Sequence, residues 1–210
     1  MYHQLSPALL DLHFNNNSAF ALHVAVGHGN ITQMHELLRA GQDINKEDTL
    51  ERSPGQFGTP LHIAIWCNQQ EAFDSLLVYG PNLDVLDGGI DPRFEDTPLR
   101  LAVWLGRREM VKQLWHAGAQ HKKYASYIPV LSHESLPEVA ACEGHAAIVE
   151  DLLLWSKEWT QVERNVAIRV ASQEWHPDVV KVLLQWCSFT VQELESYLVS
   201  ATRHSTRGNP

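Results

Sequence analysis

An internal repeat of about 38 residues is the feature that most constrains the fold of this 210-residue chain. The stretch GTPLHIAIW at 58–66 returns as DTPLRLAVW at 96–104. Longer windows align on these without gaps, and the five copies begin near residues 20, 59, 97, 135 and 166. Units that recur at a fixed period stack on one another, because each unit completes an interior that its neighbour cannot close alone. The sequence therefore predicts a repeat array.

Each unit carries the pattern of two helices. Thr59 and Pro60 suit the N-cap and first position of a helix, because the Thr oxygen accepts a free amide and Pro has no amide to leave unpaired. Leu61 and Ala64 then follow at the spacing of one helix face. A second apolar helix, such as IVEDLLL at 148–154, completes the unit. Glycines stand where a left-handed residue ends this second helix in the first three copies: Gly41, Gly80 and Gly118.

These units resemble the ankyrin repeat, whose signature is T-P-L-H-x-A. The resemblance is clear in three copies and weaker in two, where Pro137–Glu138 and Ile168–Arg169 replace the Leu-His pair. It implies an all-α fold, an ankyrin-repeat α-solenoid of helix-turn-helix repeats with finger loops and capping helices. The first four copies start 38 or 39 residues apart. The family period is about 33, so we expect each finger to be roughly five residues longer than usual.

We expect one domain over 1–201, with capping helices at 6–14 and 190–201, and a disordered tail at 202–210. No leader-like segment and no run of ~18 apolar residues is visible, and the three cysteines form no close pair. These features predict a cytoplasmic or nuclear protein. The formal charge of −9 disfavours nucleic acid and anionic membranes and favours a neutral or basic protein partner.

The resemblance also implies a binding groove. Counting the signature Thr as one, positions eight and nine of ankyrin repeats face a concave groove. Here they read Gly27–His28, Trp66–Cys67, Trp104–Leu105, Cys142–Glu143 and Gln173–Glu174. Tryptophan is enriched at interaction hot spots, so we expect the groove to bind another protein around Trp66 and Trp104. The expected flanking residues are Phe57, Arg93, Phe94, Asp96, Arg100, His133 and Glu143. Alternatively, the fingers fold over the groove and the two tryptophans complete a local core.

A second hypothesis is that the fingers close the groove into a pocket for a small apolar or aromatic ligand, or for an isomerase or cyclase reaction. Its acid and base groups would come from Asp91, Glu95, Asp96, His133 and Glu143. No nucleophile motif, P-loop or paired-histidine metal motif is present, so the sequence predicts no metal and no cofactor. An adaptor for a larger complex would need an added box helix, whereas 191–203 is typical of a cap.

The histidines at repeated positions are expected to be structural. His23 and His62 match the signature histidine, which in the family bonds between repeats, and His145 and His176 match a Gly-His step. Arg100 replaces the signature histidine in the third copy, where it pairs with Asp96 or another finger carboxylate, or meets an anionic ligand.

Overall fold

The computed structural model describes residues 6–15, 17–48, 57–87, 96–120, 135–186 and residue 195. The chain divides into two compact units, 1–132 and 133–210. The described part of the first unit contains α1 (Pro7–Phe14), the 3-10 turn η1 (Ser18–Phe20), α2 (Ala21–Gly27), α3 (Ile31–Arg39), α4 (Pro60–Trp66), α5 (Gln70–Val78), α6 (Pro98–Trp104) and α7 (Arg108–His116). That of the second contains α8 (Leu136–Cys142), α9 (Ala146–Trp155), α10 (Gln161–Gln173) and α11 (Pro177–Trp186).

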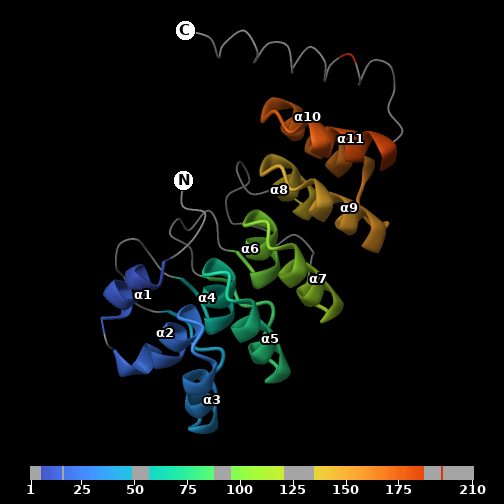
Figure 1. Ribbon diagram of the computed structural model, residues 1–210. Helices are drawn as coiled ribbons and strands as arrows, with labels where there is room; N and C mark the ends of the chain where they lie inside the picture. The colour runs from blue at the N-terminus through green and yellow to red at the C-terminus, as the bar shows by residue number, and fades with distance from the viewer. Residues whose placement is uncertain are drawn as a thin grey trace, which may run out of the picture. The chain divides into compact units, whose positions relative to one another are not determined.

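The first unit is a stack of three helix pairs. Helices α2, α4 and α6 form one row, and α3, α5 and α7 form a second row beside it (Figure 1). Each helix of the first row packs on its own partner and on the next helix of the row. Helix α1 packs on α2, on the side away from α3 (Figure 1). The predicted all-α stack of paired helices is confirmed.

The second unit repeats this arrangement with two pairs. Helix α8 packs on α9 and α10, and α11 packs on α10 and α9. Helix α10 begins at Gln161, five residues before the predicted start of the fifth copy. Thr160 and Glu163 form a capping box there, in which the Thr160 amide donates to the Glu163 carboxylate at 2.7 Å. The T-x-x-E pattern at 160–163 was the sequence signal for this earlier start.

One turn joins the two helices in all five pairs. The residue after the turn donates its amide to the carbonyl of the alanine five positions earlier, at 2.8–2.9 Å; the alanines are Ala25, Ala64, Ala102, Ala140 and Ala171. The residue before this donor has a positive φ in every copy; these residues are Gly29, Asn68, Gly106, Gly144 and Trp175. The two degenerate copies therefore keep the backbone geometry of the other three.

The signature histidine ties the second repeat to the third. The His62 Nδ1 accepts from the Thr59 amide at 3.1 Å, which leaves the proton on Nε2, and Nε2 donates to the Asp96 carbonyl at 3.1 Å. Burial lowers the pKa of His62 to about 4, against the opposing effect of the Asp96 carbonyl. The structural role predicted for His62 is confirmed.

His23 is buried in a different way. Phe20 stands at its signature Thr position, and the His23 ring lies 5.2 Å from the ring of Phe14 and 5.3 Å from that of Phe20. Burial lowers its pKa to about 4, although the charge of Asp48 opposes the shift. His23 is therefore a neutral core residue in an aromatic cluster.

Two aspartates close the bases of the first two fingers. The Asp48 amide donates to the Gly58 carbonyl at 3.0 Å, and its carboxylate accepts from the Phe57 amide at 3.0 Å. In the second finger, the Asp87 amide donates to the Asp96 carbonyl at 3.0 Å, and the Asp87 carboxylate accepts from the Asp96 amide at 3.1 Å. The ends of each finger are thereby held together. The finger segments 49–56, 88–95 and 121–134, the predicted cap at 190–201 (apart from residue 195) and the tail lie outside the described residues.

A polar ladder also joins successive repeats. Asn45 accepts from the Asn82 amide at 2.7 Å, and Asp84, one repeat later, accepts from the Gln120 amide at 2.8 Å. The next residue at this place is Lys122, whose side chain has no acceptor. The ladder thus depends on a short acceptor side chain in each repeat.

We predict that the protein loses stability in acid through His23 and His62. The unfolded state binds their protons near the ordinary histidine pKa of 6.5 and the native state only near 4, so stability falls as pH drops below 6.5 and is lost through pH 4. Between pH 7 and pH 4.5, each histidine is expected to lower the free energy of unfolding by roughly 2.5 kcal/mol. Urea unfolding at pH 7 and 4.5 should show a smaller difference for His62→Gln than for the wild type. His116→Gln, at an exposed position, controls for loss of a histidine. An equal pH dependence in wild type and His62→Gln would contradict the assignment.

We predict that Asp84→Ala lowers the free energy of unfolding by about 1 kcal/mol, because the Gln120 amide loses its acceptor at a partly exposed site. The matched variant Asp84→Asn supplies the acceptor that the preceding repeat uses and should stay close to the wild type. Urea titration measures both. Equal losses in the two variants would show that the charge, and not the hydrogen bond, matters.

Candidate functional site

Trp66 and Trp104 lie at the ends of α4 and α6, at equal positions of neighbouring repeats. Their ring centroids are 5.5 Å apart and the planes cross at 78°. This edge-to-face arrangement places the positive edge of one ring on the negative face of the other. The two indoles therefore pack on each other and do not enclose a third group between them.

The two rings differ in exposure. Trp66 is only 8% exposed, whereas Trp104 is half-buried. Helix α4 is buried along its whole length, so of the two predicted groove tryptophans only Trp104 presents part of its ring to solvent. The indole N–H of Trp66 has no acceptor among the described residues. The pair thus offers one accessible ring, one buried supporting ring and one buried donor.

Three other predicted contact residues are also buried. Cys67 and Leu105, beside the tryptophans, are buried at the C-caps of α4 and α6. Phe57 belongs to the core, where its ring meets that of His13 at 4.8 Å. Their burial leaves little side-chain area for direct contact with a partner. Burial raises the pKa of the Cys67 thiol to about 12, against the opposing charge of Arg107, so Cys67 is protonated at neutral pH.

A charged pair stands at the other end of α6. Arg100 Nε lies 2.6 Å from Asp96 Oδ1, and both side chains are partly exposed. Of the roles predicted for Arg100, pairing with Asp96 is therefore the one that the structure shows. Asp96 also closes the second finger and accepts from His62 through its backbone.

The remaining predicted site residues are described only in part. Glu143 is half-buried at the end of α8, in the second unit. Of the acid and base groups of the enzyme hypothesis, it and Asp96 are described, and they belong to different units. The others, and two predicted contacts, lie outside the described residues: Asp91, Arg93, Phe94, Glu95 and His133.

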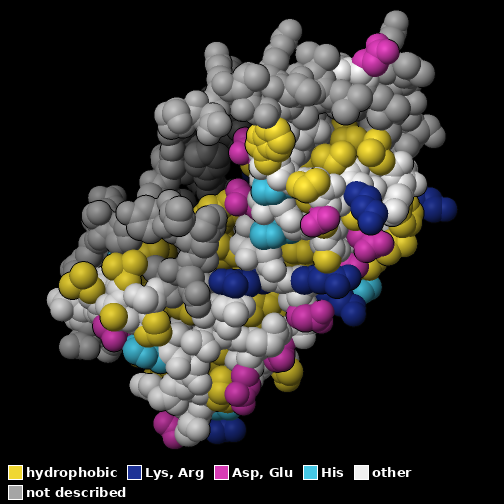
Figure 2. All heavy atoms as spheres, turned by 45° about the horizontal axis from the view of Figure 1, so that its top comes forward, with side chains coloured by type: hydrophobic (Ala, Val, Ile, Leu, Met, Phe, Trp, Pro, Cys, Tyr) yellow, Lys and Arg dark blue, Asp and Glu magenta, His cyan; other side chains and the backbone are white. Residues whose placement is uncertain are grey.

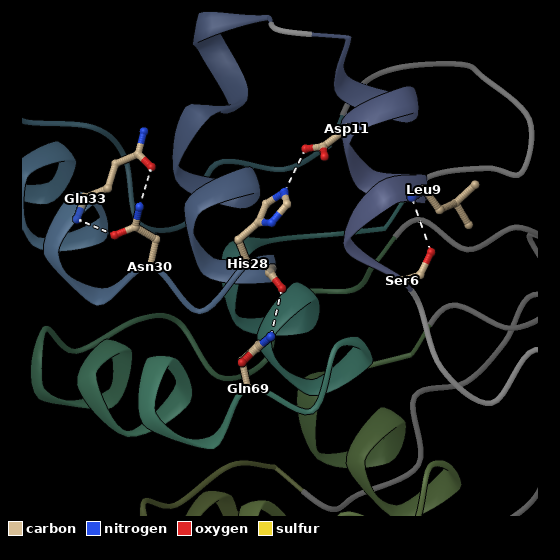
Figure 3. Close-up of polar contacts among 8 residues, drawn as sticks. Ser6, Leu9, Asp11, His28, Asn30, Gln33 and Gln69 are labelled. Atoms are coloured by element: carbon tan, nitrogen blue, oxygen red, sulfur yellow. Dashed lines mark hydrogen bonds and ion pairs between the residues drawn. The ribbon is translucent and has the colours of Figure 1, made fainter.

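Helix α1 occupies the groove positions of the first repeat, which sequence reasoning did not anticipate. The fully buried Leu10 lies directly against Gly27, and Asp11 meets the ring of His28 at 2.8 Å (Figure 3). His13 bonds the Asp48 carboxylate at 2.6 Å, which anchors α1 to the base of the first finger. A glycine at position eight, facing a Leu-rich cap, was the available signal. Helix α1 therefore covers Gly27, whereas His28 at the C-cap of α2 stays exposed.

Within the described residues, no cluster of three or more histidine, cysteine or acidic side chains is arranged to hold a metal ion. Nor does any described helix combine the length and hydropathy needed to cross a bilayer.

Known proteins show the same repeat. The family described as ankyrin repeats, in three copies, matches residues 22–125. The p105 subunit of nuclear factor NF-kappa-B from Gallus gallus is 26% identical over 125 residues, which are 60% of this chain and 12% of that protein. The chain thus spans a small part of the length of this relative. The stacked helix pairs and the family match agree, and the chain is an ankyrin-repeat protein.

Proposed function

We propose that the chain binds a partner protein through the surface around Trp104, at the ends of α4 and α6. Ankyrin repeats generally mediate protein–protein interactions, and this chain holds three copies that match the family over 22–125. The observation that carries the proposal is the edge-to-face pair of Trp66 and Trp104, whose outer ring is partly exposed.

The pair has the properties of a binding anchor. A partly exposed indole that rests on a second, buried indole has little freedom to lose when a partner covers it. Burying the rest of an aromatic ring contributes apolar free energy, and such rings dominate interface energetics.

Charge supplies orientation around this apolar centre. Arg100 lies in the first turn of the helix that ends at Trp104, and its partner Asp96 lies just before that helix, so the pair presents both signs at the helix start. Charged groups at the rim of an interface favour one docking orientation and contribute modestly to affinity. The finger residues Arg93 and Phe94 remain predicted contacts.

We predict that Trp104→Ala weakens partner binding by at least ~2 kcal/mol, about 30-fold in Kd, because the exposed anchor is lost. The partner is first captured from the native source with the wild-type chain, and its Kd is then measured by calorimetry for each variant. Trp186→Ala, which removes a tryptophan that is 43% exposed on α11, is the matched control. Trp66→Ala is less informative, since deleting a buried indole costs roughly 3–5 kcal/mol of stability.

Circular dichroism separates the outcomes. Helical content should be the same in the wild type and Trp104→Ala. Unchanged affinity in a folded Trp104→Ala protein would refute the proposed surface, and unfolding of that variant would assign Trp104 to the core.

A further inference from the structure

Trp175, in the turn between α10 and α11, combines two unusual properties. Its side chain is 55% exposed, and its backbone has φ +61°, in the left-handed region. Bulky side chains rarely adopt this conformation, because Cβ approaches the following carbonyl. Neither burial of the ring nor local backbone preference explains a tryptophan here.

The backbone conformation itself is set by the repeat. The amide of His176 donates to the Ala171 carbonyl at 2.9 Å, the same bond that closes the equivalent turn in every copy. At this place the other four copies have residues that tolerate a positive φ: Gly29, Asn68, Gly106 and Gly144. The chain therefore holds a large aromatic ring at a position where glycine would be the less strained choice. Strain that persists in this way is typical of functional positions.

The neighbouring turn brings acidic side chains close to Trp175. The His176 Nε2 donates to the Cys142 carbonyl at 2.9 Å, and a Cβ on Gly144 would lie 2.6 Å from His176 Nδ1. The turn at 142–145 thus lies directly against the turn at 173–176. Glu143 lies in the first of these adjoining turns and Glu174 in the second, next to Trp175 in the chain, and Asp178 follows in the exposed first turn of α11.

The two adjoining turns carry a negative formal charge. Residues 142–146 and 173–178 contain three carboxylates and neither lysine nor arginine. Over 135–186 there are eight acidic and four basic residues, a formal charge of −4. Hydrophobic and acidic side chains lie among histidine, lysine and arginine side chains on the face that Figure 2 shows. An electron-rich ring among carboxylates attracts a cation, and tryptophan is the best of the aromatic residues for that contact.

We propose that the edge formed by Glu143, Glu174 and Trp175 binds a lysine-containing segment of a partner protein. The cationic head lies over the Trp175 ring and pairs with the glutamates, while its methylene stem covers apolar surface. This surface belongs to the second unit and does not depend on the proposed role of Trp104 in the first.

The probe is N-acetyl-hexalysine amide, titrated into the full-length protein and followed by calorimetry and by the indole N–H resonances. Trp175→Gly keeps the net charge and relieves the backbone strain. It should weaken hexalysine binding at least fivefold while leaving the urea midpoint unchanged or raised. Glu174→Gln should weaken binding at least twofold. Trp186→Ala, an exposed tryptophan in the last turn of α11, is the matched control and should bind as the wild type does.

Two further measurements define the chemistry. The same peptide with acetylated lysines should not bind, since acetylation removes the charge. Added salt should weaken binding of hexalysine. Absence of saturable binding, equal affinity in Trp175→Gly, equal binding of the acetylated peptide, or a lower urea midpoint for Trp175→Gly would each overturn the proposal. The last result would assign the ring to packing.

Discussion

Backbone groups of one repeat are satisfied by side chains of the next, and the rest of the structure depends on this exchange. His62 donates to a carbonyl of the third repeat, and Gln69 donates to the Gly27 carbonyl of the first at 3.0 Å. In the second unit His176 takes the place of Gln69, and its ring donates to the Cys142 carbonyl. A buried carbonyl or amide without a partner costs about 1–3 kcal/mol, so a single helix pair taken alone would lose both these bonds and its apolar contacts. The protein is therefore stabilised by contacts between stacked repeats.

This dependence limits where the sequence can vary. The alanine that accepts the turn hydrogen bond is present in all five copies, whereas the eighth position changes from Gly27 to Trp66, Trp104, Cys142 and Gln173. An alanine at the turn allows the helices to approach closely, and a larger residue there would separate them. The eighth position ends the inner helix and tolerates different sizes. Variation in chemistry is thus concentrated at the helix ends, where both proposed surfaces lie.

The two surfaces use tryptophan differently. Trp104 rests on a second indole and offers an apolar anchor at the end of a helix that carries an ion pair at its start, which suits a partner with a complementary apolar side chain. Trp175 stands exposed in a turn that also carries Glu174, which suits a cation. At the first repeat the equivalent space is filled by α1, whose Leu10 packs where Gly27 leaves room. The accessible surface therefore depends on which residues each repeat has at the end of its inner helix and in the turn that follows.

Local patterns in the sequence determined the repeat, the helix pairs, the role of His62 and the adjacency of Trp66 and Trp104, because these depend on short-range spacing and on a constant register. A T-x-x-E pattern at 160–163 also indicates the start of α10, although the repeat alignment placed the start of the fifth copy near residue 166. The burial of Phe57, Cys67 and Trp66 was decided only by the tertiary structure. So was the position of α1 over Gly27. The exposure of a side chain is set by neighbours that are distant in sequence, and no period within one repeat encodes them.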